Sequence, residues 1–210
     1  LYAIRGTQYR DIAAWEEALD LILSYEAKAL LPGHTRPLTE KALVQDQLRT
    51  FRDAIEYVLL KTLDCMNKGL TMSETVEQVK LPEKYLDKDY LGEFYGTVEW
   101  SVKSIYCGYV GWFDGNAAGL LPVSDREYQA VLRELIGREK LTEKIRACLA
   151  QEQYQMALQL LELTDDGQDF KDIFKEMKKE ALLGRARQTT SANARHYLIA
   201  SAKNLSDNQS

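Results

Sequence analysis

Apolar residues recur at helical spacing along nearly all of the chain beyond residue 39. Strand-like alternation is missing from this part of the sequence. In its first long stretch, large apolar side chains return mostly at intervals of three or four positions, as they do on one face of a helix: Leu43, Leu48, Phe51, Ile55, Val58, Leu59 and Leu63. This pattern predicts a mainly α fold for residues 39–210.

Capping signals divide this part of the chain into several helices. Thr39 is expected to cap the first of them. Thr71 with Glu74, and Ser124 with Glu127, have the spacing of a capping box. The expected helices cover residues 39–68, 71–79, 91–108, 124–136, 139–150, 152–163, 168–183 and 191–205.

The last four expected helices form two antiparallel pairs. Consecutive helix pairs of this length are typical of helical-repeat proteins. Their apolar spacing fits the tetratricopeptide pattern only loosely. We therefore expect repeat-like helix hairpins from residue 139 onward.

The first 38 residues follow a different pattern. Residues 1–4 and 28–31 are each typical of a short strand, and Asp11 can cap a helix between them. Strand, helix and strand are an α/β signature, but this segment is too short for a whole α/β domain. We expect a domain boundary near residue 38, with residues 1–38 as the end of an α/β domain. Because the chain opens with Leu1 inside an apolar run, we also expect it to be a fragment.

Charge and composition exclude several classes of function. The formal net charge of −5 at pH 7 provides no field that would attract nucleic acid or an anionic membrane. The apolar runs are too short for a transmembrane helix. Cys65, Cys107 and Cys148 are an odd number at wide spacings, so we expect them to be reduced and mostly packed. Unpaired cysteines favour the cytoplasm, although a periplasmic or secreted location stays open.

The chain contains two histidines, His34 and His196. Catalytic zinc sites usually take three protein ligands, so this chain cannot assemble a multi-histidine zinc site by itself. His34 follows Gly33 on an expected loop after a strand, where a ring can turn outward to a metal. The alternative for His34 is a surface histidine beside a turn. His196 has no ligand-spaced partner and is expected at the surface or in an interface.

LPGHTRP at 31–37, with RGTQYRD at 5–11 before it, resembles the last metal-binding loop of the alkyl sulfatase branch of the metallo-β-lactamase superfamily. Thr35 stands where a glycine is usual in that loop. The helical dimerisation domain of these sulfatases resembles MNKGLT at 66–71, VKLP at 79–82, EFYGTVEWSVKSIY at 93–106, GYVGWFDGNAAGLLP at 108–122 and SANARHYLIASAKNL at 191–205.

The resemblance implies a zinc-dependent hydrolase of alkyl sulfate esters that forms a homodimer. Residues 39–210 would be its dimerisation domain, and residues 1–38 the C-terminal piece of its metallo-hydrolase domain. The family binds two zinc ions, mostly through an H-x-H-x-D-H motif and carboxylates that would precede Leu1. Only His34, on the second metal, matches a ligand in this chain. In this family, the resemblance implies, a metal-bound water with its pKa lowered to about 7 would be the nucleophile. We expect the isolated chain to be inactive and to bind no zinc tightly.

The family also places an arginine and a tyrosine at its sulfate pocket. Arg5 matches the arginine, and its planar guanidinium suits a sulfate. Tyr106 or Tyr109 matches the tyrosine. A structural salt bridge is the alternative for Arg5, and simple packing is the alternative for the tyrosines. The aromatic side chains of Trp112 and Phe113 could line a pocket for the alkyl chain. The alternative is that they pack in the core or in a dimer interface.

A non-catalytic, repeat-like helical module that binds a peptide or a partner helix is the alternative function. It predicts a monomer with an open concave groove. The dimerisation domain instead predicts a symmetric interface of roughly 2,000 Å² or more in total. The alternative function does not account for the opening strand–helix–strand segment, because an interaction module does not require one.

Overall fold

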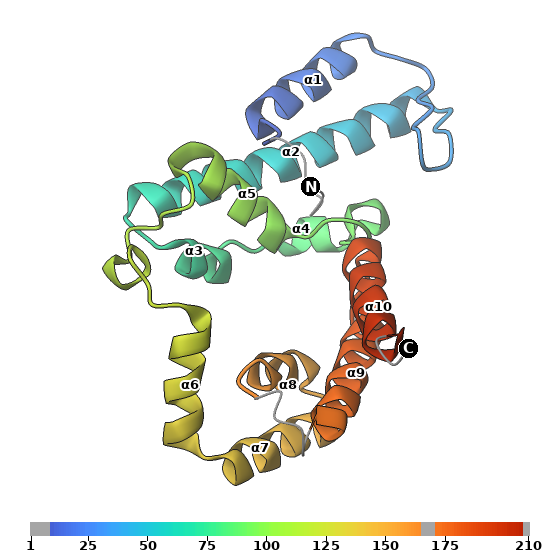
Figure 1. Ribbon diagram of the computed structural model, residues 1–210. Helices are drawn as coiled ribbons and strands as arrows, with labels where there is room; N and C mark the ends of the chain where they lie inside the picture. Colours follow the sequence, from blue (N-terminus) through green and yellow to red (C-terminus); the bar gives the residue numbers. More distant parts are fainter. Residues whose placement is uncertain (1–8, 165–170, 208–210) are drawn as a thin grey trace. The chain divides into compact units, whose positions relative to one another are not determined.

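The structure is a computed structural model that describes residues 9–164 and 171–207. It divides into two compact units, Leu1–Leu120 and Leu121–Ser210 (Figure 1). The described residues are mostly helical, and their β-pairing is confined to one isolated antiparallel bridge between Leu30 and Leu38. The predicted mainly α fold is therefore confirmed.

The helices follow one another closely along the chain. The first unit holds α1 (Ile12–Ser24), α2 (Lys41–Asn67), α3 (Met72–Gln78), α4 (Glu83–Leu86), the 3₁₀ turn η1 (Asp89–Leu91), α5 (Val98–Val110) and the 3₁₀ turn η2 (Ala117–Gly119). The second unit holds α6 (Asp125–Ile136), α7 (Arg138–Ala150), α8 (Tyr154–Leu161), α9 (Lys171–Arg187) and α10 (Ala192–Asp207).

Helix α2 is the centre of the first unit. Helices α1, α3 and α5 all contact it. Its apolar face is excluded from solvent, since Val44, Ile55 and Val58 are fully buried. Val102 and Ile105 of α5 are buried in the same cluster. Burying one such side chain stabilises the fold by about 1.5–3 kcal/mol. This cluster is the core that holds the first unit together.

An ion-pair network also joins α1 to α2. The guanidinium of Arg52 on α2 lies 2.6 Å from a carboxylate oxygen of Glu16 and 3.0 Å from one of Asp20, both on α1. It also lies 2.6 Å from Glu56 on its own helix. Burial raises the pKa of Glu16, although the charge of Arg52 opposes that effect. Arg52 is therefore the cation that keeps a cluster of carboxylates together between two helices.

The strand expected over residues 28–31 is reduced to a single bridge. Leu30 and Leu38 exchange two backbone hydrogen bonds, of 2.8 and 2.9 Å, and the pairing extends no further. Pro32 and Pro37 lie just inside the bridge and have no N–H to donate, so a ladder cannot grow between them. The strand expected over residues 1–4 lies outside the described residues.

Two expected helix starts are wrong. Thr39 does not cap α2, because Glu40 occupies the N-cap position and makes no side-chain cap hydrogen bond. Helix α5 begins at Val98 instead of near residue 91, because Thr97 caps it by accepting from the N–H of Trp100 at 3.1 Å. Other caps are confirmed. Asp11 caps α1, Thr71 and Glu74 form a full capping box, and Ser124 caps α6.

The second unit is built from consecutive helix pairs. Each helix from α6 onward contacts the next one described along the chain, and α7 also contacts α9. Gly184 of α9 lies so close to the ring of Tyr154 on α8 that any Cβ at this position would collide with it. This close approach accounts for a glycine within a helix, where it otherwise costs stability. The expected repeat-like hairpins are confirmed.

The predicted boundary near residue 38 stays a prediction, because it concerns a larger domain to which residues 1–38 would belong. Within this chain, α1 packs on α2 in one unit. Among the described residues, no helix combines the length and apolarity that a membrane span needs. Cys65 and Cys148 are buried as expected, whereas Cys107 is exposed, and all three are free thiols.

Replacing Arg52 by Met should lower the free energy of unfolding by about 2 kcal/mol, because the half-buried carboxylate of Glu16 loses its cation. Urea denaturation measures the change. Arg49→Met is the matched control, since Arg49 is exposed on the same helix. An equal, small loss in both variants would show that the network contributes nothing to stability.

Candidate functional site

The loop that carries His34 is short and closed at its base. The Leu30–Leu38 bridge joins its two ends, and Pro32 and Pro37 restrict the backbone between them. His34 lies near the tip with an exposed side chain, as predicted. Its ring is therefore available to a group that approaches from outside the first unit.

The described part of the chain does not by itself complete a metal site. Among the described residues, no three His, Cys, Asp or Glu side chains cluster in a way that could hold a metal ion. A metal ion bound by His34 would therefore need further ligands from outside the described residues. Its assignment as a metal ligand stays a prediction. Arg5, the expected sulfate-binding arginine, lies outside the described residues.

The two candidate tyrosines of α5 have different environments. Tyr106 is only 6% exposed, and its hydroxyl donates a hydrogen bond of 3.0 Å to the backbone carbonyl of Leu70. Burial raises the pKa of Tyr106, and the charges of Asp114 and Glu74 add to this effect. Tyr109, one turn later, is exposed. Tyr106 therefore has a structural partner, whereas Tyr109 is free to meet a ligand; a sulfate role for either stays a prediction.

A third tyrosine, Tyr9, lies beside Tyr109. The ring of Tyr9 lies against Gly108, where a Cβ would collide with it. Burial raises the pKa of Tyr9, followed by the charge of Asp11 and a smaller contribution from Tyr109. Tyr9 was not predicted as a site residue. The signal that could have revealed it is Gly108 itself, because a glycine inside a helix marks a close approach of another group.

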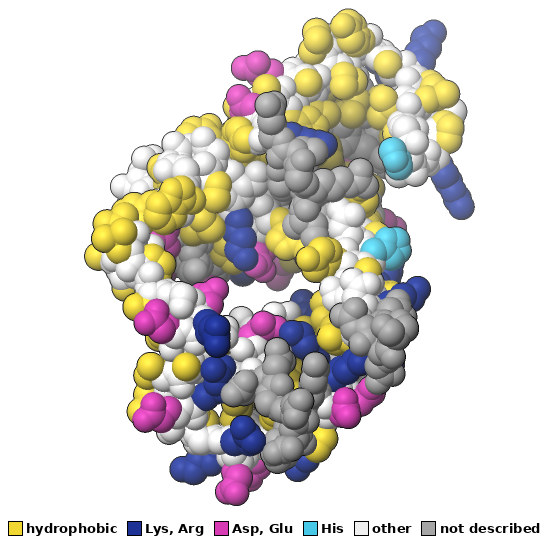
Figure 2. Space-filling model, in the orientation of Figure 1, with side chains coloured by type: hydrophobic (Ala, Val, Ile, Leu, Met, Phe, Trp, Pro, Cys, Tyr) yellow, Lys and Arg dark blue, Asp and Glu magenta, His cyan; other side chains and the backbone are white. Residues whose placement is uncertain are grey.

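The segment after α5 exposes large apolar side chains. Trp112 is 71% exposed and packs edge-to-face on Phe113, with ring centroids 5.6 Å apart. Figure 2 shows hydrophobic side chains gathered on the surface where the chain leaves α5. Asp114 forms a turn, since it accepts the N–H of Asn116 at 3.0 Å. A core position for Trp112 is therefore wrong, and an alkyl-chain pocket and a dimer interface both remain open.

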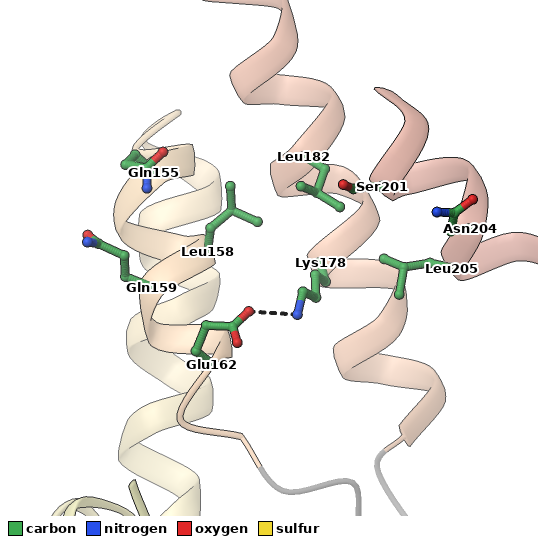
Figure 3. Close-up of a pocket in the computed structure, with 9 residues that line it drawn as sticks. All are labelled: Gln155, Leu158, Gln159, Glu162, Lys178, Leu182, Ser201, Asn204 and Leu205. Carbon is green, nitrogen blue, oxygen red and sulfur yellow. Dashed lines mark hydrogen bonds and ion pairs between the residues drawn. The ribbon is translucent and has the colours of Figure 1, made fainter. Parts of the chain in front are cut away.

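A groove of about 520 Å³ lies between α8, α9 and α10 in the second unit (Figure 3). Lys178 and Glu162 form an ion pair of 2.7 Å across it. The remaining lining combines leucines with amide and hydroxyl side chains: Gln155, Leu158, Gln159, Leu182, Ser201, Asn204 and Leu205. Amides both donate and accept hydrogen bonds, as an extended peptide requires of its binding site. This groove is the feature that the alternative interaction-module function would use.

Comparison with known proteins assigns most of the chain. A family model described as "Alkyl sulfatase dimerisation" matches residues 71–208. A linear primary-alkylsulfatase from a Pseudomonas strain is 41% identical over 143 residues, which are 67% of this chain and 27% of that protein. A second linear primary-alkylsulfatase from Pseudomonas is 29% identical over 209 residues, which are 97% of this chain and 31% of that protein.

Solved structures agree with this assignment. The chain is similar to a double mutant of the sec-alkyl sulfatase PisA1, with a TM-score of 0.89 and 28% identity over 97% of this chain and 33% of that one. It is also similar to the stereoselective inverting sec-alkylsulfatase Pisa1 from Pseudomonas, with a TM-score of 0.87. The chain spans about a third of the length of these proteins.

The hydroxyl of Tyr106 provides a direct test of its structural role. Tyr106→Phe should lower the free energy of unfolding by about 1 kcal/mol, because the part-buried carbonyl of Leu70 loses its donor. Thermal or urea denaturation measures the loss. Tyr109→Phe, with an exposed hydroxyl on the same helix, should change stability by only a few tenths of a kcal/mol. Equal stability of the two variants would contradict this role.

Proposed function

This chain belongs to the alkyl sulfatase dimerisation family, and we propose that it provides the dimerisation region and one edge of the active site of a zinc-dependent hydrolase of alkyl sulfate esters. The observation that carries the proposal is the extent of the match. The family model begins at residue 71, but similarity to the sec-alkyl sulfatase PisA1 covers 97% of the chain. The structural similarity therefore includes the His34 loop as well as the helices.

The proposed substrate is a class, not one compound. The similar proteins are named for linear primary and for secondary alkyl sulfates. What these names share is an ester of sulfate with an aliphatic alcohol. The exposed Trp112, with the part-buried Phe113 packed on it, would suit the aliphatic part of such a substrate, and the exposed hydroxyl of Tyr109 would suit its sulfate.

The role that we propose for His34 is that of a single zinc ligand. An exposed imidazole at the tip of a loop closed by a backbone bridge is suited to this role. The other ligands would come from parts of a larger protein outside this chain. By this proposal the 210 residues alone are catalytically inactive.

The proposed partner is a second copy of the chain. The competing function, a monomeric module that binds a peptide in the α8–α10 groove, makes the opposite prediction for the mass in solution. Sedimentation velocity at micromolar concentration separates the two. A species of about 48 kDa, twice the 24.0 kDa of the chain, supports the dimerisation region, and a stable monomer supports the module.

His34→Ala tests the proposed edge of the active site in the larger hydrolase. We expect loss of one metal equivalent and a fall of at least 100-fold in turnover of a medium-chain alkyl sulfate, because a ligand is removed. Metal analysis and a sulfate-release assay measure the two effects. His196→Ala, which changes the other exposed histidine, is the control and should keep both. Unchanged metal content and turnover in His34→Ala would reduce His34 to a turn residue.

A further inference from the structure

Helix α6 is strongly amphipathic, yet none of its residues is buried. Three large apolar side chains, Tyr128, Val131 and Leu135, are 59%, 54% and 76% exposed. They are spaced by three and four residues, so they form one continuous stripe along the helix. Figure 2 shows hydrophobic side chains on the surface along this helix. We call these three residues the α6 stripe.

The α6 stripe is not a consequence of a poorly formed helix. Ser124 caps the N-terminus by accepting the N–H of Glu127 at 3.2 Å, and Asp125 lies in the first turn, where a negative charge is favourable. Gly137 ends the helix with a positive φ of 79°. A helix with both ends formed in this way presents its side chains in fixed directions.

The attachment of α6 to the second unit uses other residues. Ile136 packs against the cluster formed by α7, α8 and α9. Arg133 donates a hydrogen bond of 3.4 Å to the carbonyl of Leu163. At 100° per residue, these two side chains point away from the direction of Val131. The contacts that hold α6 in place therefore leave the stripe uncovered.

The apolar surface continues into the segment before the helix. Leu121 is 90% exposed and Val123 is 59% exposed. Single exposed apolar residues are normal, but five large ones within residues 121–135 form an unusual concentration, and such patches mark interaction sites. All five lie within residues 71–208, which the dimerisation family model matches.

We infer that a second copy of this chain covers the α6 stripe, and that Leu121, Val123, Tyr128, Val131 and Leu135 form the apolar centre of the dimer interface. This inference rests on the proposed function, which supplies the partner. Five side chains cannot provide the roughly 800 Å² that each partner buries in a stable interface. They are therefore the centre of a wider surface whose rim is polar, as the flanking Glu127 and Glu134 are.

The double substitution Val131→Glu and Leu135→Glu tests the inference on the full chain. Both side chains are exposed in one copy, so the fold should persist, but a dimer would have to bury two unpaired carboxylates. We expect the dimer dissociation constant to rise on the order of 100-fold or more, measured by sedimentation velocity over a range of concentrations. Circular dichroism and thermal unfolding check that the fold is retained.

A matched control lies on the opposite side of the same helix. Ala130→Glu adds one carboxylate at an exposed position about 100° from Val131, about 160° from Tyr128 and about 140° from Leu135. It should leave the dimer dissociation constant within a factor of about three. Should the double glutamate variant unfold, Leu135→Gln is the milder substitution, with an expected weakening of about tenfold.

The outcomes separate this inference from the proposed function. A wild-type dimer that dissociates in the stripe variants but not in Ala130→Glu supports both. A wild-type dimer that persists in the stripe variants overturns the inference and leaves the dimerisation function intact. A wild-type chain that is monomeric at every concentration contradicts the dimerisation function itself.

Discussion

Burial of one face of α2 is the interaction on which the first unit depends. Helices α1 and α5 have 13 residues each, and α3 has 7, lengths at which an isolated helix is marginal or unstable in water. Each gains its stability by placing apolar side chains against the 27-residue α2. Because the His34 loop leads directly into α2, and Tyr106 reaches back from α5 to Leu70 just after it, both candidate sites take their positions from this helix.

The second unit is organised differently, by contacts between successive helices. Such an arrangement spreads stability along the chain, because each helix depends mainly on its neighbours. The close contact of Gly184 with Tyr154 fixes how α9 lies on α8, and the groove opens beside that contact. Helix α6, at one end of the series, makes its main helix–helix contact with α7, and it is the helix that keeps its apolar stripe exposed. Because α6 is the first helix of this series, a partner could pack against its exposed apolar face.

The sequence predicted the long helices well and their surroundings less well. Apolar spacing placed α7 and α10 to within a few residues, because a buried face must repeat with the period of the helix. The start of α5 was missed, since the cap at Thr97 outweighed the apolar residues before it. The strand over residues 28–31 failed because pairing depends on a partner segment, here limited by two prolines, and not on local preference alone.

Candidate site residues were harder to predict than helices. The exposure of His34 followed from its turn, a local property. Tyr106 and Tyr109 look equivalent in sequence, yet one is buried against Leu70 and the other is exposed, because only the packing of α5 distinguishes them. Tyr9 is separated from its neighbour Gly108 by about half of the chain's length, so apolar periodicity could not connect them.

The closed base of the His34 loop has a consequence for the thermodynamics of ligand capture. Ordering one residue of a free chain costs about 1–2 kcal/mol of conformational entropy. In the loop over residues 31–37, the bridge at its base and the two prolines impose much of that order when the chain folds. The ligand proposed for His34 would therefore meet a loop backbone that is already ordered, so less conformational entropy would be lost on binding.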